Sequence, residues 1–168
     1  FYRFLLYHNY IEQDPSELLE TPKKEMHLPE TLSLEEIDLM IAQIDMSKSD
    51  SHRNRAIIEI LYGSGLRVSE LINLRLSDMY LQEGYMRIIG KGSKQRLVPI
   101  SPIAVEWFEY WLQDRSALDI KPEAIDIAFL NRYGRQLTRA MIFTIIKTLA
   151  RKAGIQKTIS PHTLRHSF

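Results

Sequence analysis

The sequence predicts a mainly α-helical domain that carries a small antiparallel β-sheet, an α+β fold. Two observations favour this fold. Several segments repeat apolar residues at helical spacing behind N-terminal caps, and one segment has two β-rich runs around a tight turn. The chain has 168 residues, 45% of them hydrophobic, which is enough for one domain with a buried core.

Composition excludes several classes of protein. The chain has no cysteine, which excludes disulfides and thiolate metal sites. It has no apolar run long enough for a membrane helix and no pattern typical of a signal peptide, so we expect a cytoplasmic location. The first residue is Phe1 and not Met, so we expect a cut or processed N-terminus.

The front of the chain is predicted to be separate from the main domain. Residues 1–19 have the pattern of the end of a helix, and Pro15, Pro22 and Pro29 follow closely. Because proline interrupts helices and keeps a chain extended, we interpret residues 20–32 as a linker. The main domain is then residues 33–168.

Helical spacing and capping residues locate the elements of the main domain. Ser33 and Glu36 form a capping box ahead of an apolar stripe that begins at Leu34. Segment 85–100 has β-rich runs on both sides of a Gly-Lys-Gly-Ser turn, which predicts a hairpin. A short strand is expected near residues 127–130, and helices are predicted over residues 33–44, 54–65, 66–74, 101–112 and 138–153.

Charge is distributed unevenly along the chain. The net charge is +1, but residues 127–168 contain eight Lys and Arg and no acidic residue. The first 126 residues hold the other 14 basic residues and all 21 acidic ones, a balance of −7. This asymmetry indicates a polyanion partner for the C-terminal part, and the alternative is a solvated basic face.

Two cations lie in segments that could bind a phosphate. Arg67 is expected in the first turn of a helix, where backbone amides and a guanidinium can hold one anion; the alternative is a surface arginine paired with Glu70. Lys91 lies between two glycines in the hairpin turn, with Lys94 and Arg96 shortly after it. The alternative there is a solvated hairpin tip, since the segment lacks the P-loop pattern.

The segment HTLRH, at the start of the last predicted helix, combines two functional side chains. His162 and Arg165 share a helix face; histidine transfers protons near neutral pH, and arginine binds two phosphate oxygens at once. His162 and His166 also have metal-ligand spacing. The glutamate of the metalloprotease motif is absent and the surroundings are cationic, so no metal is predicted and His166 is interpreted as structural.

Three motifs in this order resemble one known family. GLRVSEL at residues 65–71, GKGSKQRLVPI at 90–100 and HTLRHSF at 162–168 resemble the catalytic domain of tyrosine recombinases, the phage integrase family, and above all its bacterial Xer-type members. The resemblance runs from about residue 15 to the end. It implies the catalytic-domain fold of DNA breaking-rejoining enzymes, incomplete at the C-terminus, and it assigns residues 1–19 to the last helix of an otherwise absent DNA-clamping domain.

The resemblance also implies a mechanism that needs no metal, nucleotide or other cofactor. In this family a tyrosine hydroxyl attacks a DNA phosphodiester and forms a 3′-phosphotyrosyl link. By resemblance, Arg67 and Arg165 bind the non-bridging oxygens, Lys91 protonates the leaving 5′-oxygen, and His162 accepts the proton of the nucleophile. The nucleophilic Tyr and a second His or Trp are expected after residue 168, so we expect this chain to lack a nucleophile and not to cleave DNA.

The implied partner is double-stranded DNA. Candidates for contacts to its backbone are Lys94, Arg96, Arg135 and Arg139, and such contacts are sensitive to salt and only weakly selective for sequence. Family members act as tetramers on two DNA sites. We therefore expect a homo- or hetero-tetramer for the full-length protein and a monomer for this chain.

Other functions stay open on the sequence alone. One is a DNA-binding module that keeps the scaffold without the chemistry, and another is a type IB topoisomerase with similar chemistry. A metal-dependent nuclease is poorly supported because no group of carboxylates lies near the basic region. The DNA target is also open, as is the choice between chromosome-dimer resolution, which serves chromosome partition, and integration of a mobile element.

Overall fold

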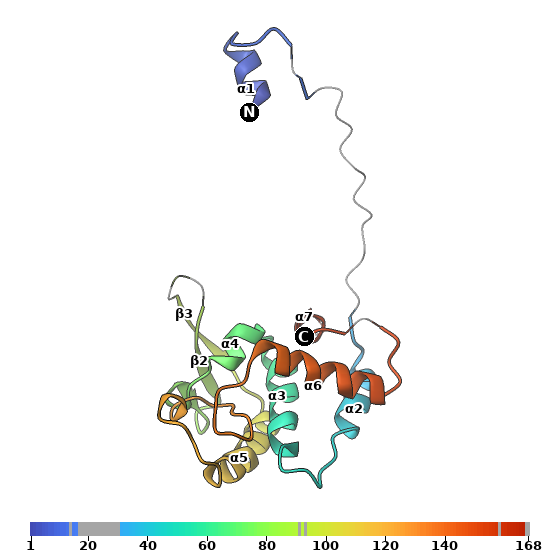
Figure 1. The fold of residues 1–168 in the computed structure, drawn as a ribbon, viewed down its shortest axis with the longest axis vertical. Helices are drawn as coiled ribbons and strands as arrows, with labels where there is room; N and C mark the ends of the chain where they lie inside the picture. Colours follow the sequence, from blue (N-terminus) through green and yellow to red (C-terminus); the bar gives the residue numbers. More distant parts are fainter. Residues whose placement is uncertain (14, 17–30, 91, 93, 158, 167–168) are drawn as a thin grey trace.

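The computed structural model describes residues 1–168 except 14, 17–30, 91, 93, 158, 167 and 168 (Figure 1). For residues 162, 165 and 166 it describes the backbone only. The α-helices in the described residues are α1 Tyr2–Tyr7, α2 Leu34–Ala42, α3 Ser51–Ser64, α4 Val68–Ile72, α5 Pro102–Ser116, α6 Arg139–Lys152 and α7 Pro161–His166. The strands are β1 Met79–Tyr80, β2 Tyr85–Ile89 and β3 Gln95–Pro99, and short 3₁₀ turns cover Leu76–Asp78 and Pro122–Ala124.

The structure confirms the predicted mainly α fold with a small antiparallel sheet. The strands lie in the order β1-β2-β3, and β2 and β3 form the predicted hairpin, with Ile88 opposite Arg96. Pro99 ends the edge strand β3, where a missing backbone donor is tolerated. Strand β1 was not predicted, since two residues carry no readable period. The strand expected at 127–130 is reduced to isolated bridges, Arg75 with Ile127 and Leu130 with Gln136.

Helix α3 forms the centre of the domain. It packs against α4, α5 and α7, while α6 packs against α2, α4 and α7 (Figure 1). The predicted inward residues Ile57, Ile60 and Leu61 are fully buried on α3. Phe108 of α5 meets Phe129 edge to face, with ring centroids 5.5 Å apart. Burial of these large apolar side chains is the main stabilising contribution to the fold.

Local capping determines where several helices begin and end. The Ser33–Glu36 capping box is confirmed: the Glu36 amide donates to Ser33 Oγ at 3.2 Å, and the Ser33 amide donates to Glu36 Oε2 at 2.8 Å. Helix α3 ends at Gly65, which has a left-handed φ of 55°. Leu34 differs from expectation, because it is 57% exposed although its spacing matched the buried stripe.

The structure describes only part of the first 32 residues, which were predicted to be a separate helix and a linker. Helix α1 buries none of its residues. Most of the proposed linker, residues 20–30, lies outside the described residues, and Leu32 at its end is buried in the main domain. The boundaries at residues 19 and 32 stay predictions. In the part of the chain that the structure describes, no helix is long and apolar enough to cross a membrane.

Candidate active site

Arg67 lies in the sharp connection between α3 and α4. After the left-handed Gly65, buried Leu66 anchors the turn, and Arg67 adopts an extended conformation (φ −72°, ψ 148°) as the N-cap residue of α4. The sequence placed Arg67 in the first helical turn; it lies one position earlier, where its side chain is 55% exposed. This position directs a cation to solvent beside the backbone amides of a helix start.

The carboxylate of Glu70 joins Arg67 to the β-hairpin. Its Oε1 accepts hydrogen bonds from Nη1 of Arg67 at 3.0 Å and from Nη1 of Arg96 at 2.8 Å. Its Oε2 accepts from the backbone amide of Arg67 at 2.8 Å and from Nη2 of Arg96 at 2.9 Å. The Glu70 side chain is only 4% exposed. The predicted alternative, an Arg67–Glu70 pair, is therefore present, and it leaves other N–H groups of Arg67 to solvent.

The arginines determine the ionisation of Glu70. Burial is the largest influence on the pKa of this carboxyl and raises it, but hydrogen bonds from Arg96 and from the amide and side chain of Arg67 together outweigh burial. The resulting pKa of Glu70 is lowered from 4.5 to about 2. Glu70 is thus an anion at neutral pH, and this charge compensates the two guanidinium groups only in part.

Glu70, Arg67 and Arg96 together form what we call the Glu70 cluster. We expect this cluster to lose its stabilising effect in acid. A carboxyl whose pKa is lowered on folding stabilises the fold above its unfolded value of 4.5, and this contribution disappears as pH falls toward about 2. At about 1.4 kcal/mol per pKa unit, the contribution is at most about 3 kcal/mol, because the exposed arginines are screened by solvent. Urea unfolding of the wild type and Glu70→Gln should therefore give free energies of unfolding that converge as pH falls. A constant difference from neutral to acid pH would contradict the assignment.

Helix α7 carries the backbone of His162 and Arg165. Its predicted start is confirmed, because the Thr163 amide donates to Ser160 Oγ at 3.3 Å and Pro161 is the first helical residue. Leu164 is fully buried and anchors the helix. Both α7 and α4 pack against α3 and α6, which brings the His162–Arg165 helix and the Arg67 helix to the same two neighbours (Figure 1).

The remaining predicted catalytic residue, Lys91, lies outside the described residues. Its neighbour Gly90 is described, and the Gly90 amide donates to the carbonyl of Lys94 at 2.8 Å. A Cβ on Gly90 would lie 3.6 Å from Arg96 Nη1 and 3.9 Å from Glu70 Oε1. The hairpin therefore approaches the Glu70 cluster at the residue just before Lys91.

Within the described residues, many basic side chains after residue 126 lack the acidic partners that arginines earlier in the chain have. Several arginines of the first part are paired, as Arg53 is with Asp50 and Arg87 with Asp78. Among the side chains that the structure describes, no ion pair engages six exposed cations of the later part, and these are Arg132, Arg135, Arg139, Lys147, Arg151 and Lys152. Lys94 is also exposed. This part of the surface has the excess positive charge that a polyanion would neutralise.

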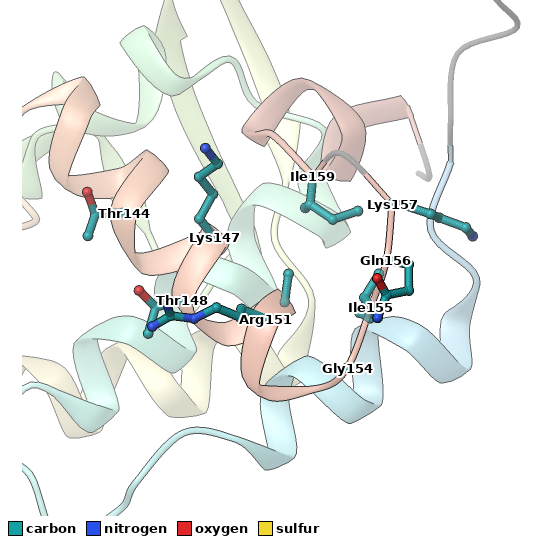
Figure 2. Close-up of a pocket in the computed structure, with 10 residues that line it drawn as sticks. Thr144, Lys147, Thr148, Arg151, Gly154, Ile155, Gln156, Lys157 and Ile159 are labelled. Carbon is teal, nitrogen blue, oxygen red and sulfur yellow. The ribbon is translucent and has the colours of Figure 1, made fainter.

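A cleft of about 620 Å³ continues this charged surface along α6 (Figure 2). Thr144, Lys147, Thr148 and Arg151 line it from α6, and the segment after α6 lines it with Gly154, Ile155, Gln156, Lys157 and Ile159. Lys157 at its edge is engaged elsewhere, because its Nζ donates to Glu36 Oε2 at 2.7 Å. Sequence reasoning counted Lys147 and Arg151 as basic residues but did not select them, since only the fold places them around one cleft.

The described residues contain no group of three His, Asp, Glu or Cys side chains positioned to hold a metal ion. The buried carboxylates near the site face arginines instead: Glu70 faces Arg67 and Arg96, and Asp78 faces Arg87. Such an arrangement is suited to binding an anionic group through cationic side chains.

Comparison with known proteins places this fold in a family. Residues 30–168 match the model of the phage integrase family. The whole chain is 46% identical over 168 residues to the tyrosine recombinase XerD of Lacticaseibacillus casei and 46% identical over 169 residues to that of Oceanobacillus iheyensis. In both cases the chain spans 57% of the length of the relative.

Solved structures agree with this assignment. The crystal structure of XerA recombinase is 32% identical, with a TM-score of 0.72, over 84% of this chain and 50% of that one. XerH recombinase bound to difH substrate in a pre-cleavage complex is also 32% identical, with a TM-score of 0.73, over 86% of this chain and 43% of that one. The Tn1549 transposon integrase, 18% identical over 99% of this chain and 60% of that one, shares the fold with a TM-score of 0.73. The chain therefore belongs to the phage integrase family, the tyrosine recombinases.

Proposed function

We propose that the full-length protein is a site-specific recombinase that breaks and rejoins DNA through a 3′-phosphotyrosyl intermediate. The observation that carries this proposal is the position of Arg67. Its guanidinium is half exposed at the start of α4, and α4 shares α3 and α6 as neighbours with the helix that carries His162 and Arg165. The pre-cleavage and post-cleavage complexes of the relative XerH with difH substrates support the same chemistry.

The proposed roles follow from the chemistry of each side chain. Arg67 and Arg165 bind the non-bridging oxygens of the scissile phosphate, where guanidinium groups stabilise the charge of the transition state. Lys91, one residue after Gly90 in the hairpin, protonates the leaving 5′-oxygen. His162 accepts the proton of the attacking hydroxyl. No step needs a metal or a nucleotide, because one phosphoester is exchanged for another.

The proposed DNA surface extends from the hairpin to α6. Lys94 lies on the hairpin, Arg135 precedes α6, and Arg139 is the first residue of α6; all three are exposed. The cleft residues Lys147 and Arg151 extend the same positive surface. We assign these side chains to the DNA backbone, which makes binding dependent on salt. Arg96, also predicted as a backbone contact, faces Glu70 and is assigned a further role below.

We propose that residues 1–168 alone do not cleave DNA, because no tyrosine in them stands in the nucleophile motif of the family. We also propose that the full-length protein acts as a tetramer on two DNA sites, with residues 1–168 alone monomeric.

A nicked suicide substrate tests the proposed function. Such a substrate traps a phosphotyrosyl protein, because the short strand released on cleavage diffuses away. We expect the full-length protein to form a covalent adduct in the presence of a chelator, and residues 1–168 to form none. The adducts are detected by denaturing electrophoresis with labelled DNA.

Each other outcome identifies a different function. If the full-length protein binds DNA but forms no adduct, it is a binding module. If it forms adducts and relaxes supercoiled DNA without a specific site, it is a type IB topoisomerase. An adduct with residues 1–168 would contradict the assignment of the nucleophile to a later segment.

A further inference from the structure

Arg96 and Arg67 share one carboxylate although they lie on different elements. Arg96 comes from β3 and Arg67 from the N-cap of α4. Both terminal nitrogens of Arg96 bind Glu70, one to each oxygen, at 2.8 and 2.9 Å. Arg67 reaches the same two oxygens through one guanidinium nitrogen and its backbone amide. The stronger, two-pronged interaction therefore belongs to Arg96.

This division leaves the Arg67 guanidinium available. Of its side-chain nitrogens only Nη1 donates to Glu70, and among the described residues Arg67 makes no other side-chain hydrogen bond. Its Nε and Nη2 groups can therefore form the two parallel bonds with which arginine grips a phosphate. Without Arg96, the Glu70 carboxylate could close a two-pronged pair with Arg67 and engage those donors.

Charge leads to the same conclusion. Two guanidinium groups around one carboxylate leave one net positive charge beside the proposed phosphate position. Removal of Arg96 would take one positive charge away from the surroundings of Glu70 and Arg67. The electrostatic stabilisation of the charge that develops on the scissile phosphate in the transition state would decrease, even though Arg67 itself is unchanged.

The position of Arg96 on β3 argues against a role as a simple backbone contact. Arg96 lies opposite the buried Ile88 and alternates with exposed Gln95 and Leu97, so it belongs to the inward face of the strand. Its guanidinium is also close to Gly90, where a Cβ would lie 3.6 Å from Nη1. Arg96 therefore attaches the hairpin to the start of α4 through Glu70.

We propose that Arg96 is a positioning residue: by occupying the Glu70 carboxylate, it keeps the guanidinium of Arg67 available for the scissile phosphate. This inference rests on the proposed recombinase function. It assigns Arg96 an effect on the rate of cleavage rather than on affinity for DNA.

The test uses the full-length protein and single-turnover cleavage of the suicide substrate at saturating DNA. Arg96→Lys keeps the positive charge but loses the two-pronged geometry. We expect it to slow cleavage roughly 10-fold to 100-fold, the usual effect of losing a supporting contact behind an active group. The affinity for DNA and its dependence on salt should stay those of the wild type.

Arg87→Lys is the matched control. Arg87 lies on the neighbouring strand β2, is 39% exposed like Arg96, and pairs with Asp78, which is 5% exposed as Glu70 is 4% exposed. It differs in that its carboxylate partner, Asp78, makes no ion pair with Arg67 or Arg96. Arg87→Lys should cleave at the wild-type rate, and both variants should have similar melting temperatures.

A double variant tests whether Arg96 acts through Glu70. If it does, Arg96→Lys should add little to the effect of Glu70→Gln on cleavage, because both changes disrupt one unit. Independent, additive effects would overturn the proposal. So would an Arg96→Ala variant that cleaves normally at saturating DNA but loses about one unit of salt dependence, the signature of a backbone contact. A wild type that forms no adduct would instead remove the proposed function on which the inference rests.

Discussion

Replacing Arg67 by Lys should reduce the rate of DNA cleavage by the full-length protein roughly 10²-fold to 10³-fold, the usual loss when one group that stabilises a transition-state oxyanion is removed. Lysine keeps the charge but cannot present two parallel N–H groups to a phosphate. It would also change the pairing with Glu70, which now uses Nη1 of Arg67 at 3.0 Å. The measurement is single-turnover formation of the covalent adduct at saturating DNA.

Arg55→Lys is the control for this substitution. Arg55 lies on α3, where its Nη2 is 2.8 Å from Glu59 and its guanidinium lies over the ring of Trp107, with 5.1 Å between Cζ and the ring centroid. It thus has an acidic partner close by in sequence, as Arg67 does, but that partner lies outside the Glu70 cluster. Cleavage by Arg67→Lys at the rate of Arg55→Lys would contradict the assignment of Arg67 to the phosphate.

Gly134→Ala should be the most destabilising small substitution that the structure identifies. Gly134 has a φ of 68°, which is unfavourable for alanine, and a Cβ there would lie 1.9 Å from the carbonyl oxygen of Asp119. The neighbouring backbone would have to move, so we expect a loss of about 3 kcal/mol in the free energy of unfolding. For a domain of this size, the melting temperature should fall by roughly 6–12 °C.

Gly84→Ala separates the steric clash from the backbone strain. Gly84 has a φ of 74°, and a Cβ added there would have no atom within 4 Å. Its carbonyl accepts a backbone hydrogen bond from Ile100, as that of Gly134 does from Lys121. Only the conformational strain applies in Gly84→Ala, so the free energy of unfolding should decrease by about 1 kcal/mol. Thermal unfolding of both variants checks this, and equal losses would show that the close approach at Gly134 does not matter.

Helices and the hairpin could be predicted because their signals act over a few residues. Ser33 and Glu36 cap α2, Gly65 ends α3, and Thr138 starts α6 by accepting a hydrogen bond from the Met141 amide at 3.2 Å. The predicted helix boundaries were wrong where tertiary packing decides how far a helix extends. Helix α3 begins at Ser51, three residues before the prediction, and Ser51 is buried. The apolar spacing along the chain gave no signal for the three additional residues at the start of α3.

Several contacts that shape the domain had no signal in the sequence. The Arg115 guanidinium donates to the carbonyls of Ala124, Ile125 and Ile127 and holds that loop against α5. His52 Nδ1 lies 2.8 Å from Asp114 Oδ2 and joins α3 to α5 across 62 residues of sequence. Pairs this distant depend on how the helices pack, and local spacing cannot identify them.

The candidate site divides in the same way. Sequence motifs selected Arg67, Lys91, His162 and Arg165 and resembled those of the family, and residues 30–168 match that family's model. Their assignment to catalytic roles stays a prediction. The motifs also contained Glu70 and Arg96. Their spacing indicated a possible pair of Arg67 with Glu70, but nothing in the sequence indicated that Arg96 shares the same carboxylate.

By itself, the sequence determined the helices, the hairpin and the family, because caps, apolar spacing and motifs depend on residues close together in the chain. Only the tertiary structure decided that Glu70 is shared between Arg67, three residues away, and Arg96, 26 residues away. The physical reason is that a buried carboxylate takes the donors that the fold brings within about 3 Å, whatever their separation in sequence.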